Sequence, residues 1–452
     1  MAKELKKLNC LMCGTGEYTT GWTGSGASQS DKKSLVISDD GNARQKSFSY
    51  VVALTLFDLR RLGKVDQLGM VGTNGRKFPA IRQHLQEKIA DVYTDMDVSL
   101  VLRHNGAQRL AVETIFKSYP DNESVDGEAY KRAIDELSKG DAVIIFTPDS
   151  THYPIALYAI ERGLHVLVTK PATQLLKHHQ DLIEKAKEHN VVVFVEHHKR
   201  FDPAYSDAKA RSAALGEFNF FSAWMSQPKS QLETFRAWAG KDSDISYYLS
   251  SHHIDICCWI LADKAVPTRV VASAATGIAT SEPYNCVPQT EDTITLLVDW
   301  QSIKSANHKG TAVYTASWTA PTTSGVHSAQ HWYYMGEKGE LTLDQAHRGY
   351  EMVVDGQGKS YFNPFYMKYS PSETGHFDGQ RGYGYVSIEK FIDAARSVNA
   401  GESKPGDYDK HGLPTIANTV LTTAILNAGR ISLDEKRPVY IKQGANEEWI
   451  LE

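Results

Sequence analysis

The sequence predicts an α/β protein with an N-terminal, doubly wound parallel sheet and a C-terminal α+β domain that has a large, open, mostly antiparallel sheet. Three observations lead to this fold class. Short apolar runs alternate with segments of helical periodicity up to about residue 196. From about residue 217 the segments lengthen and alternate apolar with polar residues. A chain of 452 residues is also too long for one compact core, because domains usually hold about 100–200 residues.

The first predicted element is a buried strand that enters a glycine-rich turn. Leu8 to Cys13 form a short apolar run, and Gly14-Thr15-Gly16 close it. The next segment is rich in Gly, Ser, Thr, Asp and Lys, so we expect an insertion at about 21–47. The alternation then continues with helices at 48–62, 78–89, 129–138, 153–162 and 177–189, strands at 68–72, 141–146, 165–168 and 191–195, and a second insertion at about 97–130.

We place the domain boundary after residue 171, which gives domains of residues 1–171 and 172–452. The last helix and strand of the parallel series, about 177–196, and the C-terminal helices are expected to pack back on the first domain. In the second domain, period-two alternation and helical spacing predict strands at 270–274, 293–300 and 311–318, and helices at 246–261, around 386–397 and around 414–428.

Composition excludes several classes of protein. The 54 acidic and 49 basic residues give a formal charge of −5, which offers no net attraction for nucleic acid or for an anionic membrane surface. No apolar run approaches the roughly 20 residues of a membrane span, and we expect a cytoplasmic protein. Five cysteines, mostly within apolar segments, argue against a disulfide framework. Cys10 and Cys13 have the spacing of half a zinc or redox motif, but their positions in a strand also explain them.

Ligands of a parallel sheet lie beyond the carboxyl ends of its strands, so the residues that follow each strand are the candidates for a site. The turn Gly14-Thr15-Gly16 would allow backbone N–H groups to approach a pyrophosphate. Thr19 stands where a third glycine is usual, and a bare Gly-x-Gly is often an ordinary turn. The other strand ends carry Thr147-Pro148, Lys170-Pro171 and the run from Glu196 to Arg200.

The end of the second strand indicates which nicotinamide cofactor would fit. Thr73, Asn74 and Arg76 occupy the region where an acidic residue normally holds an adenosine ribose. The missing acid and the nearby arginine favour NADP, while Asn74 can still bond the unphosphorylated ribose of NAD. Arg76 has a simpler interpretation as the cap of an exposed turn.

Lys170 and His252 are the candidates for proton chemistry. Pro171 fixes the backbone that follows Lys170 and keeps it out of a regular helix. His252 and Asp255 are three positions apart on a predicted helix, so they share one face, and His253 lies beside them. A histidine can act as a general base because its pKa lies near the working pH. Two interpretations stay open: a His/His/Asp metal site, or a structural histidine.

With these residues placed, the chain resembles the Gfo/Idh/MocA oxidoreductases, the family of glucose-fructose oxidoreductase and inositol dehydrogenase. The resemblance covers nearly the whole chain. The segments that carry it are Thr147-Pro148-Asp149-Ser150-Thr151-His152, Lys170-Pro171, His198-Lys199-Arg200-Phe201-Asp202-Pro203, His252-His253-Ile254-Asp255 and Leu413-Pro414-Thr415-Ile416-Ala417-Asn418.

The resemblance implies an N-terminal Rossmann domain, a C-terminal sheet that covers the active site, and a homodimer or homotetramer. It implies hydride transfer between NADP or NAD and a secondary hydroxyl of a sugar, a sugar derivative or an inositol-like polyol. His252 would accept the hydroxyl proton and Lys170 would polarise the oxygen, although the two roles can be exchanged. Cofactor contacts are expected from Gly14, Thr15, Gly16, Glu17, Tyr18, Thr73, Asn74, Arg76, Thr147, Pro148, His152, Lys170, His198 and Lys199.

Two residues depart from the family's pattern. Thr169 replaces the glutamate before the catalytic lysine, so we expect Lys170 to lack an adjacent carboxylate that stabilises its charged form. Tyr248 replaces an aspartate before the histidine, so its hydroxyl is a candidate substrate ligand. The expected substrate contacts are polar and aromatic, since a polyol needs both hydrogen bonds and apolar faces: Lys199, Arg236, Trp238, Tyr248, His252, His253 and Tyr383. Trp238 and Tyr383 can equally be core or interface residues.

Two other functions fit the same resemblance. The first is a glycoside-cleaving enzyme that uses a tightly held NAD for transient oxidation. The second is a nucleotide sensor without catalysis, which the retention of both Lys170 and His252 disfavours. No metal is expected in the site.

Overall fold

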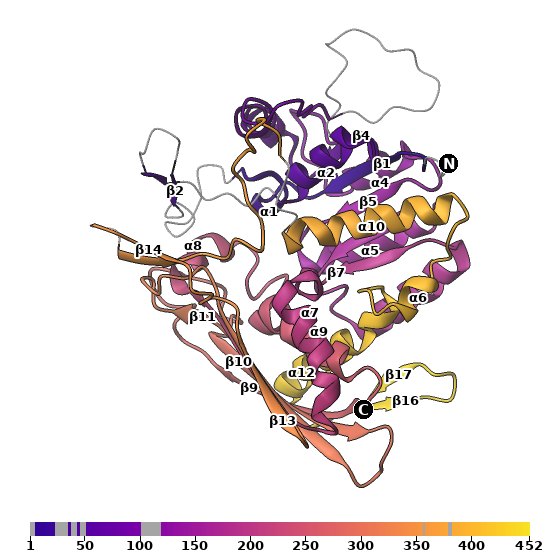
Figure 1. The fold of residues 1–452 in the computed structure, drawn as a ribbon, viewed down its shortest axis with the longest axis vertical. Helices are drawn as coiled ribbons and strands as arrows, with labels where there is room; N and C mark the ends of the chain where they lie inside the picture. The colour runs from indigo at the N-terminus through magenta and orange to yellow at the C-terminus, as the bar shows by residue number, and fades with distance from the viewer. Residues whose placement is uncertain are drawn as a thin grey trace.

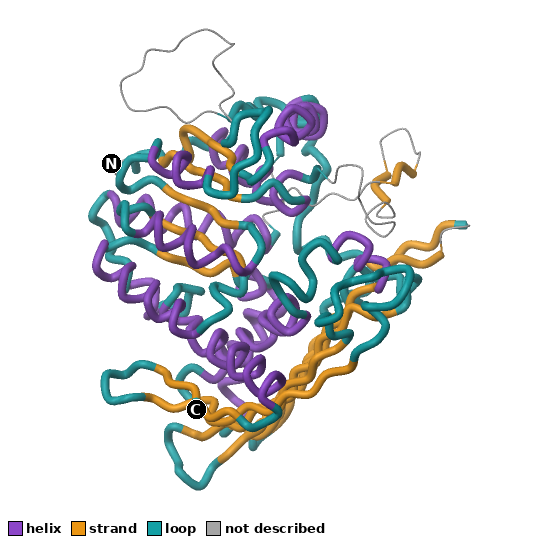
Figure 2. Tube along the Cα trace, turned by 180° about the vertical axis from the view of Figure 1, so that it is seen from behind, coloured by secondary structure: helices purple, strands orange, loops and turns teal. Residues whose placement is uncertain are grey.

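The computed structural model describes residues 5–22, 35–37, 43–45, 51–100, 119–355, 358–377 and 382–452. A parallel sheet flanked by helices occupies one end of the molecule, and a long sheet runs along the other side (Figure 1). Helices α7 (Pro203–Arg211), α9 (Ser251–Leu261) and α12 (Val420–Glu435) lie between the two sheets. The same division into a helix-rich part and a strand-rich part is visible from behind (Figure 2).

The first sheet is parallel and has the order β4-β1-β5-β6-β7. Its strands are short and apolar, and buried on both faces, which is typical of a parallel sheet covered by helices on each side. Their bounds are Leu8–Cys13 for β1, Val65–Val71 for β4, Ala142–Ile145 for β5, His165–Thr169 for β6 and Val193–Glu196 for β7. The predicted doubly wound parallel sheet is thus confirmed.

Helices cover both faces of this sheet and form a separate apolar core on each. One core includes α2 and the C-terminal helix α10, and the other includes α4 and α5. The C-terminal helix α10 lies across this sheet in Figure 1. The bounds are Glu17–Thr20 for α1, Val51–Arg61 for α2, Phe78–Leu85 for α3, Ala129–Asp135 for α4, His152–Ile160 for α5, Leu176–His189 for α6 and Tyr383–Asn399 for α10.

The second sheet has the order β13-β12-β8-β11-β10-β9-β16-β17 and is antiparallel except between β8 and β11. Its strands alternate buried with more exposed residues, so one face packs on α9 and α12 around Trp300, Trp318 and Trp332. The strand bounds are Phe218–Pro228 for β8, Ala265–Ala275 for β9, Thr293–Ser302 for β10, Lys309–Ala320 for β11, Ala329–Gly336 for β12, Gly339–Asp344 for β13, Val439–Gln443 for β16 and Trp449–Leu451 for β17.

The structure corrects some of the predicted boundaries. Within the insertion at 21–47, residues 35–37 and 43–45 form a small hairpin, β2 (Leu35–Ile37) and β3 (Ala43–Gln45), instead of loop. The helix expected around 414–428 begins later, at Val420, and runs to Glu435, because residues before it form the 3₁₀ turn Ala417–Thr419. A second hairpin, β14 (Glu351–Val354) with β15 (Gly358–Tyr361), and two short helices, α8 (Leu232–Phe235) and α11 (Asp407–Lys410), were not predicted.

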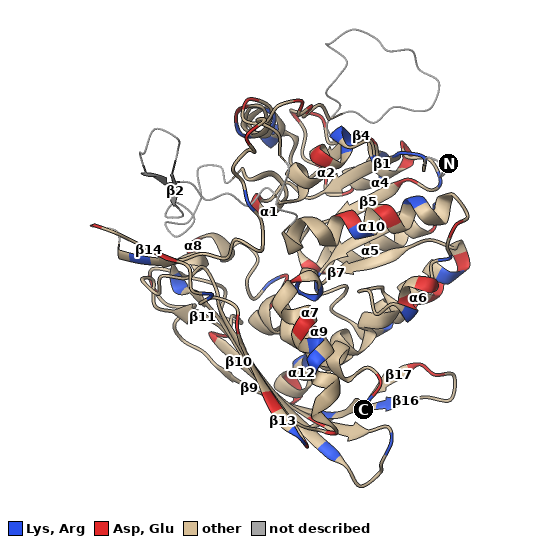
Figure 3. Cartoon of the chain, viewed as in Figure 1, with Lys and Arg blue, Asp and Glu red and all other residues tan. Residues whose placement is uncertain are grey.

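Charged side chains are mixed in sign over the described surface. Both acidic and basic residues occur along α6 and α10 in Figure 3. Among the described residues, no helix has both the length and the apolar character that crossing a membrane requires. All five cysteines are buried and unpaired, including Cys10 and Cys13 of β1.

We predict that Gly14→Ala destabilises the fold by about 2 kcal/mol or more. Gly14 has a φ of +114°, and an added Cβ would lie 2.1 Å from the carbonyl oxygen of Phe146 at the end of the neighbouring strand. Gly16→Ala is the matched control, since no atom lies within 4 Å of its added Cβ. Urea denaturation of both variants is the measurement. Equal free energies of unfolding for the two variants would contradict the packing argument.

Candidate active site

Lys170 follows β6 at the carboxyl edge of the parallel sheet. Its side chain contacts the turn that precedes α9, the helix that packs on the second sheet. Its ammonium group donates a hydrogen bond to the carbonyl oxygen of Tyr248 and lies 4.3 Å from the centre of the Tyr248 ring. Tyr248 belongs to the π-helical turn Ser246–Ser250, which leads into α9. Tyr248 therefore precedes His252 by one helical turn, so Lys170 lies beside the start of the helix that carries His252.

Burial and two carboxylates act on Lys170 in opposite directions. Desolvation lowers its pKa to about 8, while the charges of Asp149 and Glu196 oppose that decrease. The expectation that Lys170 lacks a carboxylate neighbour because of Thr169 is therefore wrong. Asp149 follows β5 and Glu196 ends β7, so both carboxylates come from adjacent strand ends instead of the adjacent residue.

His252 is buried in surroundings that disfavour its charged form. Its side chain lies in α9 with its ring centre 5.1 Å from that of His198. Burial lowers its pKa well below the ordinary value, and the positive charges of Lys170 and Lys199 lower it further. The expectation that its pKa lies near the working pH is therefore wrong. Its Nδ1 atom is buried and has no hydrogen-bond partner among the described residues.

Asp255, on the same face of α9, forms a buried ion pair with Arg200. The Arg200 guanidinium donates to both carboxylate oxygens, with distances of 2.8 and 2.6 Å. Arg200 lies in the 3₁₀ turn His198–Phe201 that follows β7, so the pair ties α9 to the edge of the parallel sheet. This pairing also disfavours a metal site on His252, His253 and Asp255, because Asp255 is occupied and His253 Nε2 lies 3.1 Å from the Tyr205 hydroxyl.

His198 lies beside His252 and contacts the Glu196 carboxylate. Its Nδ1 lies 2.9 Å from Glu196 Oε1, and the Ser387 hydroxyl donates to the same carboxylate at 3.0 Å. The Tyr383 ring stacks on the other side of His198, with centroids 5.4 Å apart. Ser387 and Tyr383 both come from α10, so the C-terminal helix supports this side of the site.

Lys199 is buried and donates a hydrogen bond to Gln330 of β12. Burial lowers its pKa to about 7, Asp202 opposes the shift, and the positive charges of Arg348 and Lys170 add to it. Arg348 pairs with Asp202 at 2.6 Å. Sequence reasoning did not identify Gln330 or Arg348, since no local signal marks residues that reach the site from a distant sheet.

The glycine-rich turn after β1 combines a tight backbone contact with open space. Gly14 packs against the backbone of Phe146, whereas the space beside Gly16 is open, so a phosphate group can approach the backbone there. Thr19 is buried, and its hydroxyl has no partner among the described residues. Tyr18 stacks on Phe146 with ring centres 5.3 Å apart. These observations fit a bound pyrophosphate.

Residues at the end of β4 form a turn with one unpaired arginine. Asn74 accepts a hydrogen bond from the backbone N–H of Arg76 at 3.1 Å, and the Thr73 carbonyl accepts one from Asp126. Arg76 is exposed, and no ion pair involves it within the described ranges. A free guanidinium at this position is compatible with the 2′-phosphate of NADP.

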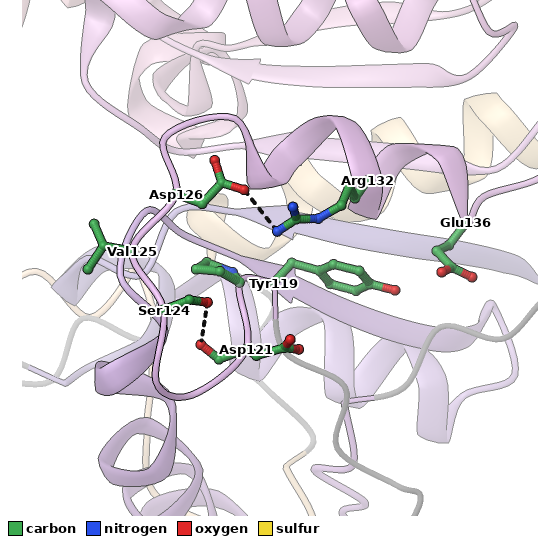
Figure 4. Close-up of a pocket in the computed structure, with 8 residues that line it drawn as sticks. Tyr119, Asp121, Ser124, Val125, Asp126, Arg132 and Glu136 are labelled. Atoms are coloured by element: carbon green, nitrogen blue, oxygen red, sulfur yellow. Dashed lines mark hydrogen bonds and ion pairs between the residues drawn. The ribbon is translucent and has the colours of Figure 1, made fainter.

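A pocket of about 530 Å³ lies near this turn. Figure 4 shows Arg132 of α4 directed at Asp126, with an N–O distance of 2.8 Å, and Ser124 bonded to Asp121. Three acidic residues line the pocket, and none of the predicted site residues does; the lining is Tyr119, Pro120, Asp121, Ser124, Val125, Asp126, Arg132 and Glu136. The pocket is therefore separate from the site around Lys170 and His252.

The remaining predicted site residues differ in their distance from Lys170. Trp238 packs on Tyr248 with centroids 5.0 Å apart, which places it near Lys170. His152 is fully buried, and its ring nitrogens lie 2.8 Å from the carbonyl oxygens of Thr147 and Pro171. It thus connects the ends of β5 and β6 and keeps Pro148 and Lys170 in place. Arg236 is exposed on the turn after α8, and Glu17 lies in α1 beside Tyr18.

Comparison with known proteins identifies a family for part of the chain. Residues 66–197 match the family model GFO_IDH_MocA, described as an oxidoreductase family with an NAD-binding Rossmann fold. The scyllo-inositol 2-dehydrogenase (NAD⁺) of Bacillus subtilis is 48% identical over 71 residues, which are 16% of this chain and 21% of that protein. The UDP-N-acetylglucosamine 3-dehydrogenase of Acidithiobacillus ferrooxidans is 32% identical over 139 residues, 31% of this chain and 42% of that protein.

The alignments thus cover less than half the length of these two relatives. Similarity of fold extends further. The scyllo-inositol dehydrogenase of Lactobacillus casei, solved with NAD(H) and scyllo-inositol, superposes with a TM-score of 0.58 over 96% of this chain and 99% of that chain, at 14% identity. The two-domain architecture therefore matches along the chain.

We predict that Asp255→Asn lowers the free energy of unfolding by about 3 kcal/mol or more, because it leaves the Arg200 charge buried without its partner. Asp299→Asn is the control, since the Asp299–Arg269 pair is 39% exposed on each side and such pairs contribute about 1 kcal/mol or less. Thermal and urea unfolding would measure both. Losses of similar size would show that the Arg200–Asp255 pair is not a structural anchor.

Proposed function

Because the chain belongs to the Gfo/Idh/MocA oxidoreductase family through its Rossmann domain, we propose that it is a dehydrogenase that transfers a hydride between a nicotinamide cofactor and a secondary hydroxyl of a sugar, a sugar derivative or an inositol-like polyol. The observation that carries this proposal is that Lys170, at the carboxyl edge of the parallel sheet, contacts Tyr248 one helical turn before His252, while the His252 ring lies 5.1 Å from that of His198. The named activities of relatives on inositol and on a nucleotide sugar support the substrate class.

Lys170 is the proposed proton acceptor for the substrate hydroxyl. With a pKa of about 8, a useful fraction of Lys170 is neutral near neutral pH and can take a proton. His252 is less suited to that role, because burial and the charges of Lys170 and Lys199 lower its pKa. We assign it a hydrogen bond to the reacting oxygen, which exchanges the roles first expected from the resemblance. The bound nicotinamide supplies the hydride acceptor or donor.

The glycine turn is the proposed cradle of the cofactor. Gly16 offers open space beside its backbone, and Thr19 offers a buried hydroxyl. Arg76 has no ion-pair partner among the described residues, so we propose NADP as the preferred cofactor, with NAD as the alternative. Lys199 and Tyr248 border the lysine–histidine pair and are the proposed substrate contacts, together with Trp238 as an apolar face.

The first test is cofactor reduction. The purified protein is incubated with NAD or NADP and a panel of inositols, hexoses, sugar acids and nucleotide sugars, and absorbance of the reduced nicotinamide is followed. We expect reduction with at least one polyol. Glycoside cleavage without net cofactor reduction, or no binding of either nucleotide in a titration, would contradict the proposal.

We predict that Lys170→Ala lowers kcat by about 100-fold or more, as expected when the group that transfers the proton is lost. Cofactor affinity should change little, since the proposed cradle lies in the glycine turn. Lys177→Ala is the control, because Lys177 is exposed at the beginning of α6. Steady-state kinetics and fluorescence titration with the cofactor separate the two effects. An unchanged kcat would remove Lys170 from the chemistry.

We predict that the rate of alcohol oxidation rises with pH, reaches half of its maximum near pH 8 and levels off at higher pH, because only the neutral form of Lys170 accepts a proton. In the direction of reduction the dependence should be reversed, since the charged form then donates. Lys170→Arg should abolish the step near pH 8, because arginine keeps its proton. The pH profile of kcat in both directions is the measurement, and a profile without a step in the wild type would contradict the assignment.

A further inference from the structure

Two histidines and one aspartate gather at the end of the second sheet, outside the site described above. His331 lies on β12 directly opposite Asp344 of β13, and their Nδ1 and Oδ2 atoms are 3.5 Å apart. His347 follows three residues later, with its Nδ1 2.8 Å from the same Oδ2. One ligand atom from each residue lies within 4.8 Å of the other two, and within the described ranges no other group of three such side chains meets this limit.

We propose that the His331/Asp344/His347 cluster binds a divalent transition-metal ion of the zinc class. Two imidazoles and one carboxylate form a set of ligands that zinc accepts, and it leaves a fourth position for water. Ligand atoms around tetrahedral zinc stand roughly 3.3 Å apart when the bonds are about 2.0–2.1 Å long. The observed separations of 2.8 and 3.5 Å lie on either side of this value. Magnesium and calcium prefer oxygen ligands and fit poorly.

The surroundings of the cluster hold the three ligands in place. Asp344 Oδ1 accepts the backbone N–H groups of Ala346 and His347 at 2.9 and 3.0 Å, which leaves Oδ2 to face the histidines. Trp224 stacks on the His331 ring with centroids 4.8 Å apart, and the edge of Tyr361 meets the His347 ring at 4.4 Å. Such contacts orient metal ligands and reduce the cost of ordering them. The side chains are between 27% and 37% exposed, so an ion can reach them.

The position of the cluster gives the metal a structural role. Two residues of the loop from Asp344 to Arg348 contact residues near the candidate active site. The Gln345 amide donates a hydrogen bond to the Tyr383 hydroxyl at 2.8 Å, and the Arg348 guanidinium pairs with the Asp202 carboxylate at 2.6 Å. A metal bound by Asp344 and His347 would fix both ends of this short loop from outside. It would thereby stabilise the contacts that Gln345 and Arg348 make with Tyr383 and Asp202 beside the candidate active site. Metal binding itself does not depend on the proposed reaction.

The experiment uses the full chain, stripped with a chelator and then titrated with Zn²⁺ by calorimetry and with Co²⁺ by visible absorption. We expect one strong site for each ion and an intense Co²⁺ band of the kind that tetrahedral coordination gives. Because loss of a supporting outer residue already weakens metal binding about 10–100-fold, loss of a ligand should weaken it about 100-fold or more. The variants are His331→Gln, His347→Gln and Asp344→Asn, in which asparagine can still accept the backbone hydrogen bonds.

His376→Gln is the matched control, since His376 faces a single carboxylate, Asp95, at 2.9 Å and belongs to no group of three possible ligands among the described residues. It should bind Zn²⁺ like the wild type. Zn²⁺ should also raise the unfolding temperature of the wild type and of His376→Gln, but not of the three ligand variants, each first confirmed as folded by circular dichroism. The absence of a one-to-one site in the wild type, or equal affinity in the wild type and all three folded variants, would overturn the proposal.

Discussion

The buried ion pair between Arg200 and Asp255 is the constraint on which the candidate site depends. It joins the turn after the last strand of the parallel sheet to the helix that carries His252, which packs on the second sheet. Both charges are almost completely buried, so each requires the other, and separation would leave an unpaired charge in an apolar core. The pair therefore ties the helix to the sheet edge. In that position, His252 lies beside His198.

The electrostatics of the site follow from this arrangement. Lys170, Lys199 and Arg348 bring positive charge into a buried region, and Asp149, Glu196 and Asp202 balance it from separate strand ends and turns. Burial lowers the pKa of the two lysines, while the carboxylates prevent a larger shift. Burial, together with the charges of Lys170 and Lys199, also lowers the pKa of His252. The lowered pKa values of the lysines and of His252 thus have the same main cause, which is burial among nearby charges.

Much of the fold was predictable because its signals are local. Continuous apolar runs mark strands that are buried on both faces, as in β5 and β6, and period-two alternation marks strands that are buried on one face, as in β10 and β11. Lys170 and His252 were found by the same kind of reasoning, one from its place after a strand and the other from helical spacing. Segments with weak periodicity, such as the β14–β15 hairpin, gave no comparable signal.

The sequence by itself determined the order of strands and helices, the glycine turn with Lys170 and His252 as candidates, and the departures at Thr169 and Tyr248, because each depends on neighbours along the chain. Only the tertiary structure decided what surrounds those residues. Glu196 and Asp149 replace the carboxylate missing at Thr169, and the backbone carbonyl and ring of Tyr248 contact Lys170. Such partners are separated by 21 to 78 positions in sequence, and burial and charge act through space, so no local pattern could indicate them.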